Sequence, residues 1–272
     1  MARTGLLAFL LLTVTGGLAR AGSISISITP AVEIKDDVLT AKVKVSNTGD
    51  EAAQSILPML RFRDGEAKGT LKNQVGPNET LEQTLNVPAK GLTPGRYPFR
   101  LSVDYTDVNQ YPFQALQVST VTVGTPVPAK IAATLEAEQL ATNGSVVVTL
   151  KNLMGDARAV TVTVHASEGI EVPGAPTTIN LAGWGTATAK VNIVNRTALA
   201  GSRYPLFAAV EYDADGVHQT VVGQSTVEIV PPRSFWADNQ QWLYMGVVAV
   251  VALWAGALVW RLLGRRAAAP TV

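Results

Sequence analysis

The chain of 272 residues contains no cysteine and only two histidines. The absence of thiols excludes disulfides, thiolate metal sites and cysteine nucleophiles, so folded domains in this chain depend on apolar packing. Aromatic residues make up 6% and charged residues 16% of the sequence, whereas 47% of the residues are hydrophobic. A chain of this length has room for two domains of about 100 residues, each large enough for its own core.

Patterns that carry catalysis are equally scarce. Neither His165 nor His218 stands in a His-acid-Ser pattern or in a metal-ligand pattern. Asp213 and Asp215 offer carboxylates for calcium, but the segment lacks the later bidentate Glu of a calcium loop, and Asp-Gly favours a hairpin turn. The sequence therefore predicts a protein that is not an enzyme, with no catalytic, cofactor-binding or metal-binding residues and no cofactor.

Long apolar runs occur only at the two ends of the chain. At the N-terminus, Arg3 precedes an apolar stretch at residues 6–14, and small residues at positions 19 and 21 flank Arg20. This pattern predicts a secretory signal peptide at residues 1–21. The alternative is an uncleaved anchor, but the run is short for about 30 Å of hydrocarbon.

The C-terminal run is long enough to cross a bilayer. Nineteen residues from Trp242 to Trp260 contain no charge, and Arg261, Arg265 and Arg266 follow. We expect a juxtamembrane segment at 232–241, a transmembrane helix at 242–263 and a basic cytoplasmic tail at 264–272. The predicted location is the cytoplasmic (inner) membrane, crossed once, with the N-terminal domains outside the cytoplasm, in the periplasm or at the cell surface.

The charge balance argues against one class of partner. Removing the five arginines of the predicted signal, membrane span and tail from the 22 basic residues leaves 17 against 21 acidic residues. This net negative charge predicts that nucleic acid is not a partner. The expected partners are the membrane and an extracytoplasmic protein or glycan.

Two segments of the chain match at a constant offset. Residues 96–105 and 203–212 share an Arg-Tyr-Pro start and a Val-acid-Tyr end, 107 residues apart. Thr80 and Thr186 begin further matching runs, and Asn47 and Asn152 lie 105 residues apart. The repeat predicts one domain at residues 22–124, a proline-containing linker at 125–129 and a second domain at 130–231.

Alternation of apolar and polar residues predicts the fold class. Residues 23–29 alternate strictly and Pro30 is expected to end that strand, while Leu39, Ala41, Val43 and Val45 form the buried face of the next. About seven short strands are expected in each repeat. The prediction is an all-β chain of two tandem immunoglobulin-like β-sandwich domains followed by one transmembrane α-helix.

Other polar and aromatic residues receive a structural interpretation first. We expect four tyrosines to pack in the cores with their hydroxyls bonded at the sandwich edge rather than to form a ligand-stacking surface. Asn78, Asn143 and Asn195 begin glycosylation sequons, which matter only in a host that modifies asparagine. The four tyrosines are Tyr97, Tyr105, Tyr204 and Tyr212.

Several motifs together resemble a known family. These are Asn-x-Gly at residues 47–49, Gly-x-x-x-Thr-Leu-x-x-Thr-Leu-x-Val-Pro at 76–88, Gly-Arg-Tyr at 95–97 and Val-x-Tyr at 103–105. The chain is similar in these motifs to the bacterial and archaeal Ig-like modules called CARDB, or the related NEW3 domain. The second repeat departs from the pattern at residues 194–196. The resemblance implies an accessory, adhesive or spacer domain and no catalytic residues.

Three functions remain open at this stage. The leading hypothesis is a non-catalytic, membrane-anchored cell-envelope protein whose paired domains bind or position an extracytoplasmic protein or glycan. An accessory subunit of a membrane transport or secretion complex is the second. A carbohydrate-active enzyme would require carboxylates to converge from Asp104, Asp107, Asp213 and Asp215, which stand in corresponding places of the two repeats.

Overall fold

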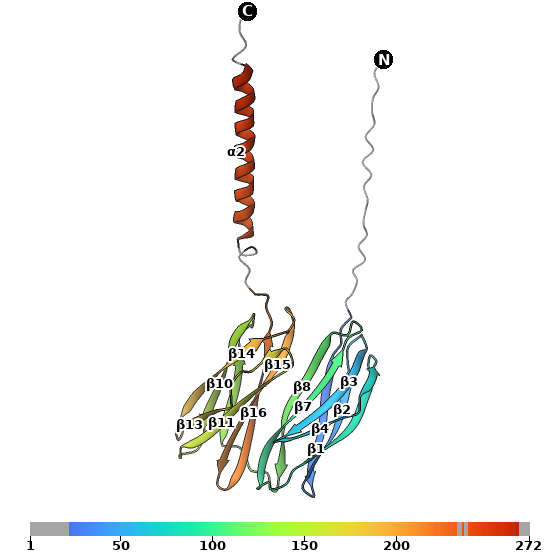
Figure 1. Cartoon of the computed structure of the whole chain (residues 1–272). Coiled ribbons are helices and arrows are strands. Elements are labelled where there is room, and N and C mark those ends of the chain that lie inside the picture. The colour runs from blue at the N-terminus through green and yellow to red at the C-terminus, as the bar shows by residue number, and fades with distance from the viewer. Residues whose placement is uncertain (1–21, 233–235, 237–238, 267–272) are drawn as a thin grey trace, which may run out of the picture. The chain divides into compact units, whose positions relative to one another are not determined.

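The computed structural model describes residues 22–232, 236 and 239–266 (Figure 1). Strands and their connecting loops form the described chain up to Glu228, and helix α2 (Gln240–Arg266) follows. The predicted fold class, β-sandwich structure followed by a C-terminal apolar helix, is confirmed. The predicted signal peptide and the last six residues of the predicted tail lie outside the described residues.

Contacts between residues divide the chain into two compact units. Unit 1 comprises the described residues up to Lys90 together with Leu101–Ala115, and unit 2 comprises Gly91–Arg100 together with the residues from Leu116 onward. Strands β7 (Gly95–Thr106) and β8 (Pro112–Val123) therefore contribute residues to both units. The domain boundaries expected from the repeat stay a prediction.

Unit 1 contains a three-stranded antiparallel sheet of β1 (Ile26–Lys35), β2 (Val38–Asn47) and β6 (Thr80–Pro88), in the order β1-β2-β6. The second sheet is built around β3 (Ala53–Phe62), which pairs with β4 (Gly65–Lys68), β5 (Lys72–Val75) and β7, while β8 pairs with β7. Apolar side chains of β2, β3 and β6 are buried, as the alternation predicts. They include Leu39, Ala41, Val43, Val45, Ile56, Leu60, Phe62, Leu85 and Val87.

One detail of the first sheet corrects the sequence analysis. Pro30 does not end its strand: β1 continues through it to Lys35, and Pro30 stands opposite Val43 of β2. Proline lacks a backbone N–H, so it is tolerated in a strand whose outward edge makes no ladder bonds. Because β1 lies at the edge of its sheet, the alternation could continue where the sequence alone predicted a break.

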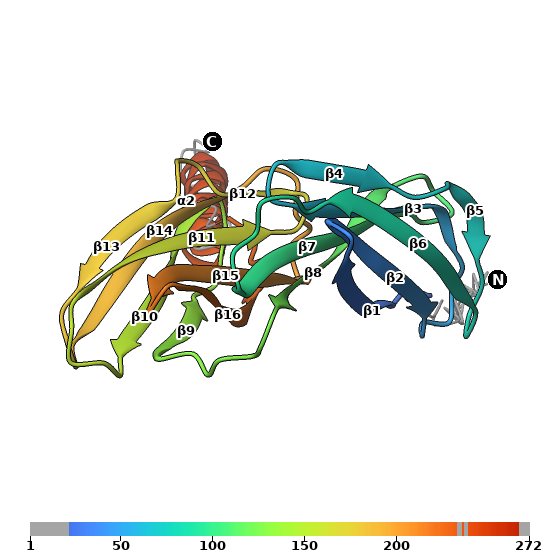
Figure 2. The same ribbon diagram turned by 90° about the horizontal axis from the view of Figure 1, so that it is seen from below.

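Unit 2 packs two four-stranded arrangements around one core (Figure 2). One sheet has the order β12-β14-β10-β9, and the other runs β13-β11-β15-β16. Buried residues from both sheets form a single cluster that includes Val146, Leu150, Val162 and Leu206. The strands are β9 (Ile131–Ala137), β10 (Asn143–Asn152), β11 (Arg158–Ala166), β12 (Ile170–Glu171), β13 (Thr177–Leu181), β14 (Thr186–Asn195), β15 (Arg203–Ala214) and β16 (Val217–Glu228).

The hairpin between β15 and β16 has the predicted turn. Asp215 and Gly216 have φ angles of 55° and 76°, the positive values that a two-residue hairpin turn of type I′ requires. The strand before this turn, β15, is buried on both faces, with Leu206 and Ala208 on the face toward the core of unit 2. Phe207 and Ala209 on the opposite face are also buried, and Phe207 packs against Leu116 and Val118 of β8 within unit 2.

Candidate functional site: an exposed apolar helix and a histidine cluster

Helix α2 (Gln240–Arg266) is the first candidate functional element. Its segment Gln240–Leu258 has a mean hydropathy of 1.7, and none of it is buried by the rest of the protein. Exposed apolar side chains include Val247, Leu253 and Trp254, each more than half exposed. A helix that is apolar all round and unburied requires an apolar environment of its own. Helix α2 is thus long and apolar enough to cross a membrane.

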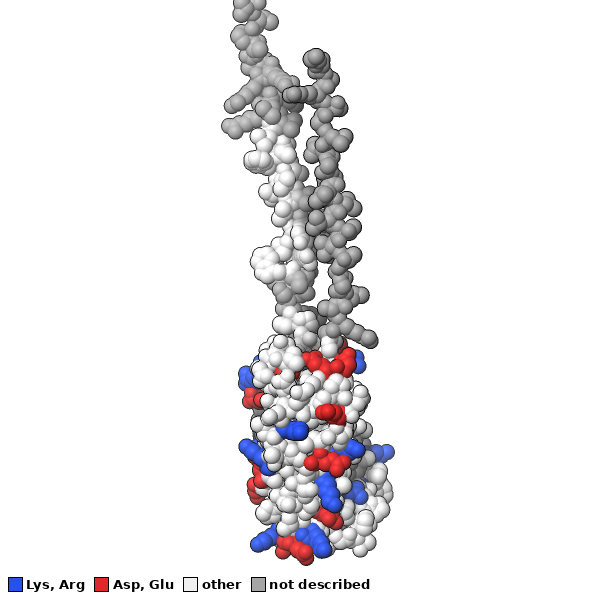
Figure 3. Space-filling model, turned by 90° about the vertical axis from the view of Figure 1, so that its right-hand side faces the viewer, with Lys and Arg blue, Asp and Glu red and all other residues white. Residues whose placement is uncertain are grey.

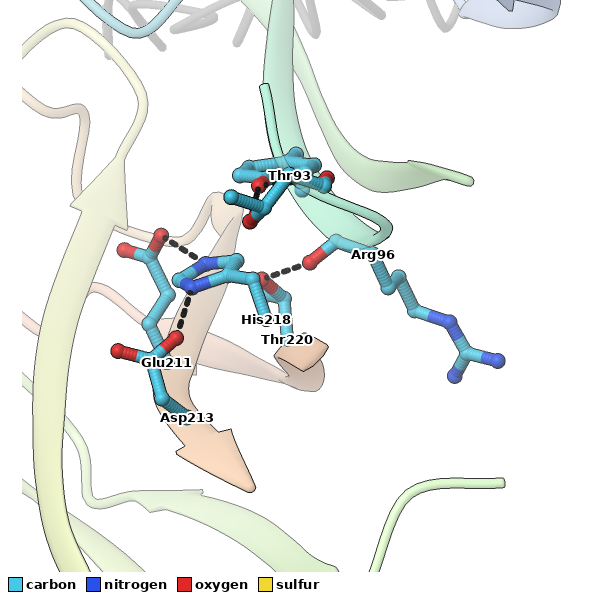
Figure 4. Close-up of polar contacts among 7 residues, drawn as sticks. Thr93, Arg96, Glu211, Asp213, His218 and Thr220 are labelled. Atoms are coloured by element: carbon cyan, nitrogen blue, oxygen red, sulfur yellow. Dashed lines mark hydrogen bonds and ion pairs between the residues drawn. The ribbon is translucent and has the colours of Figure 1, made fainter. Parts of the chain in front are cut away.

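The second candidate is a cluster around His218, at the start of β16 (Figure 4). Its Nδ1 lies 2.9 Å from Asp213 Oδ1, and its Nε2 lies 3.3 Å from Glu211 Oε1. Both carboxylates belong to β15, which pairs with β16 so that Asp213 stands opposite His218. Two acceptors on one imidazole favour the form in which both ring nitrogens carry protons. The hydrogen bond with Glu211 is the main cause that raises the pKa of His218, assisted by Asp213 and opposed by burial.

One face of the imidazole is covered by an aromatic ring. Tyr97 stacks on His218 with ring centroids 4.5 Å apart and an interplanar angle of 16°. The Tyr97 hydroxyl donates to the carbonyl oxygen of Thr93 over 2.9 Å, which fixes the ring. His218 therefore lies between a tyrosine from Gly91–Arg100 and two carboxylates from β15, all within unit 2. The side chain of Arg96 points away from the cluster (Figure 4).

The backbone around His218 also makes hydrogen bonds to the segment before β7. The His218 N–H donates to Pro94 O over 3.2 Å, and Thr220 Oγ1 donates to Arg96 O over 2.8 Å. Gly95 has a φ of 154°, and a Cβ at this position would lie 2.2 Å from His218 O. Only glycine allows this approach of the chain to β16. Backbone and side-chain hydrogen bonds therefore join the start of β7 to the start of β16 at this cluster.

His165, on β11, titrates in the opposite direction. Burial lowers its pKa to about 4, and the nearby Arg100 guanidinium acts in the same sense. The imidazole is neutral in the folded protein over the neutral pH range. The surroundings of the two histidines thus shift their pKa values in opposite directions.

The carboxylates considered for an enzyme take part in local contacts. Asp104 accepts from Gln114 over 2.7 Å, and Asp107 accepts from the backbone N–H groups of Asn109 and Tyr111. Asp213 bonds His218, while Asp215 pairs with Lys130 at 3.3 Å. Across the part of the chain that the structure describes, no group of three His, Asp or Glu side chains could hold a metal ion.

Tyrosine hydroxyls at the strand ends accept backbone bonds. Tyr212 accepts from the Lys130 N–H over 2.7 Å, and Tyr204 accepts from the Leu199 N–H over 3.1 Å. Tyr105 stacks on Phe113 with centroids 5.6 Å apart. These contacts agree with the structural interpretation of the tyrosines, except that Tyr97 stacks on His218.

The sequon asparagines differ in how far their side chains are engaged. Asn195 donates from its amide to Ala141 O at 3.0 Å and Ala198 O at 3.2 Å, so its side chain already ties two loops together. Asn143 is exposed at the start of β10, and Asn78 lies in the loop before β6. Of the three, Asn195 is the least suited to modification in the folded state.

The surface of unit 1 carries both charge signs. A shallow hollow of about 400 Å³ on the β1-β2-β6 sheet is lined partly by Lys42, Lys44 and Glu82. Figure 3 shows basic and acidic side chains interspersed over one face of the molecule, with no large area of a single sign. This mixture does not favour a highly charged ligand.

Comparison with known proteins identifies no family. No protein-family model matches the chain, and no curated protein matches it significantly in sequence. Among solved structures, the native form of Escherichia coli alpha-2-macroglobulin matches 76% of this chain, which spans 17% of that protein, at 12% identity and a TM-score of 0.33.

Two further solved structures show similarly low scores. Red sea bream transglutaminase matches 78% of this chain and 32% of its own at 14% identity and a TM-score of 0.27. The YadV chaperone matches 74% of this chain and 98% of its own at 13% identity and a TM-score of 0.30. None of these similarities supports an inference about function, and the fold assignment rests on the strands and sheets described above.

Proposed function

We propose that this chain is a non-catalytic, single-pass cell-envelope protein whose Ig-like domains bind or position an extracytoplasmic protein or glycan. The observation that carries the proposal is helix α2, whose apolar side chains are exposed although it follows a well-packed β-sandwich. A membrane is the environment that removes this apolar surface from water. The resemblance of the strand motifs to CARDB and NEW3 modules supports an accessory or adhesive role.

The proposed orientation places the sandwiches outside the cytoplasm. Arg261, Arg265 and Arg266 follow the apolar run, and basic residues are enriched on the cytoplasmic side of membrane spans. Trp242 and Trp260, near the two ends of the run, suit the two membrane interfaces. The apolar run at the N-terminus supports export of the domains.

Alkaline extraction and protease protection test this topology together. The full-length protein should stay in the membrane pellet at high pH, whereas a form ending before Trp236 should be released. Protease added outside intact spheroplasts should digest the sandwiches and leave a small C-terminal fragment. Full protection of the sandwiches, or extraction of the full-length protein, would refute the proposed topology.

A second candidate function is an accessory subunit of a membrane complex. Ala252 and Gly256 stand four residues apart on exposed α2, the spacing at which small residues allow helices to approach closely. Replacing α2 with an unrelated apolar helix should then abolish assembly while membrane attachment persists. Unchanged assembly would show that the span serves only as an anchor.

A further inference from the structure

A tryptophan stands exposed in the loop between β13 and β14. Trp184 has an exposed fraction of 69% and a φ of 55°. Left-handed backbone is uncommon for a bulky side chain and carries a conformational cost. The Trp184 ring is exposed to water, so it does not stabilise the sandwich by burial. We therefore consider a role in binding.

Backbone hydrogen bonds fasten the loop at Trp184. The Trp184 N–H donates to Met154 O over 2.8 Å, and the Gly185 N–H donates to Ala182 O over 3.0 Å. A Cβ at Gly183 would lie 1.8 Å from Gly155 O, so the loop between β13 and β14 packs directly on the backbone of the loop between β10 and β11. The ring is presented from a fixed backbone, which lowers the entropy lost on binding.

A buried asparagine fastens the two loops together. The Asn152 amide donates to Asp156 O over 2.9 Å and to Ala182 O over 3.0 Å. Its Oδ1 accepts from the Met154 N–H over 2.9 Å, and the residue is completely buried. Asn152 therefore satisfies backbone groups of both loops at once.

Unit 1 contains a similar loop, held by a buried asparagine but without the tryptophan. Its Asn47 donates to Glu51 O over 2.7 Å and to Val75 O over 3.2 Å. The residue in the place of Trp184 is Asn78, with a φ of 60° and an N–H that donates to Asn47 O over 2.8 Å. Asparagine adopts this backbone readily. The loop fold therefore does not require tryptophan at this position.

The surroundings of the ring are small and polar. A Cβ at Gly155 would lie 3.4 Å from Trp184 Nε1, so the indole borders exposed glycine backbone. Asp156 follows Gly155 in sequence, and its side chain is 83% exposed. Arg158 Nη2 lies 3.8 Å from the Asp156 carboxylate. In the loop between β10 and β11, Leu153 is a large apolar side chain with 45% exposure. The two apolar side chains, Trp184 and Leu153, supply far less surface than the about 800 Å² per partner that stable protein interfaces bury.

The site lies at the end of the sandwich from which β16 begins. The Leu153 N–H donates to Lys130 O over 2.9 Å, and Lys130 pairs with Asp215 in the β15–β16 turn. The chain leaves unit 2 after β16, whose twelve residues span about 40 Å. Trp184 is therefore presented at the end of unit 2 away from the exit toward α2.

We propose that the Trp184 loop binds a neutral pyranose residue of an extracytoplasmic glycan. The flat indole packs against the C–H face of the sugar ring, and the Asp156 carboxylate and loop peptide groups bond its hydroxyls. This inference rests on the proposed function and specifies its partner. Such single-sugar contacts are weak, and many anchored copies on one membrane gain strength by acting together.

The test uses full-length protein reconstituted in fluorescent vesicles. The vesicles are mixed with insoluble chitin, cellulose, mannan, β-1,3-glucan and peptidoglycan, and co-sedimentation is measured. Wild-type vesicles should bind at least one polymer, and Trp184→Asn should weaken that binding at least about tenfold. Trp184→Phe should bind at an intermediate level. Leu71→Asn, which removes an exposed apolar side chain of unit 1, is the matched control and should bind as wild type.

Thermal unfolding separates a binding role from a structural one. Because unit 1 carries asparagine in this position, Trp184→Asn should unfold at the same or a higher temperature than wild type. A lowered temperature together with lost binding would assign the ring a structural role and overturn the proposal.

Other outcomes also decide against the glycan site. Absence of wild-type binding to every polymer would overturn it, as would equal binding by Trp184→Asn. The latter result would leave the proposed glycan-binding function standing and reject only this site. A photoreactive residue at position 184 that crosslinks in intact cells to a protein and to no glycan would replace the sugar with a protein partner. Failure of the protein to float with the vesicles would instead reject the membrane anchor.

Discussion

At the scale of single residues, the two histidines have opposite electrostatic surroundings. His218 is bonded by two carboxylates of β15 and stacked on Tyr97, which favours its protonated form. His165 is buried near Arg100, which favours its neutral form. Each preference links protonation to folding, because the unfolded chain lacks these surroundings.

The first prediction concerns the pH dependence of stability. The raised pKa of His218 stabilises the fold fully below pH 6.5, and this contribution is lost as pH rises through the folded-state pKa. The lowered pKa of His165 stabilises the fold fully above pH 6.5, and this contribution is lost as pH falls toward 4. The two histidines together therefore favour a stability maximum near pH 6.5.

Thermal unfolding of the full-length protein in detergent, from pH 5 to 9, checks this. His218→Gln should remove the part of the slope above pH 6.5, which reaches at most about 1.4 kcal/mol per pH unit for one proton. His165→Gln should flatten the slope below pH 6.5. If the difference between wild type and His218→Gln is the same at every pH, the pKa of His218 is not raised by folding.

The second prediction concerns the buried asparagines that fasten the loops. Replacing Asn152 with alanine leaves backbone groups of two loops without their partners, so we expect a loss of about 2–3 kcal/mol in the free energy of unfolding. Asn47→Ala should cost a similar amount, since Asn47 makes the corresponding bonds in unit 1. Asn143→Ala, at an exposed position, is the control. Denaturant titration of each variant gives the comparison, and a change below about 0.5 kcal/mol for Asn152→Ala would contradict this account.

At the scale of secondary-structure elements, the third prediction concerns the outer face of β15. Phe207 is buried there against Leu116 and Val118, so Phe207→Ala should cost about 3 kcal/mol by creating a cavity. Leu71→Ala, at an exposed position, should cost little. A near-zero effect of Phe207→Ala in thermal unfolding would show that this cluster does not persist in solution.

Several strands could be predicted from the sequence because one face is buried and the other is wet. Leu39, Ala41, Val43 and Val45 were placed correctly by alternation alone. Alternation did not predict two positions in strands that lack one buried and one wet face. Pro30 occupies an edge strand that tolerates proline, and Phe207 lies on a face that other segments cover.

The candidate sites were less predictable than the strands. Helix α2 followed directly from an uninterrupted apolar run. The His218 cluster did not, because Tyr97 lies 121 residues away in sequence and no local pattern links the two. Trp184 carried a signal that was overlooked, namely an aromatic residue between two glycines where a turn normally has polar residues.

At the scale of the whole molecule, the chain joins two parts that require different surroundings. The β units bury their apolar residues internally, whereas α2 exposes its own. This division supports the proposed function, in which the anchor provides location and the β units provide contacts. The fourth prediction follows from it: the anchor should be dispensable for partner recognition.

Crosslinking mass spectrometry on intact membranes tests this central claim most directly. A tagged full-length chain is compared with a form that ends before Trp236 but is exported to the same compartment. The account predicts crosslinks from residues 22–230 to a specific extracytoplasmic protein or glycan, and the shortened form retains them. Crosslinks confined to residues 240–266, and lost with the helix, would contradict it and make the β units spacers of a membrane-complex subunit.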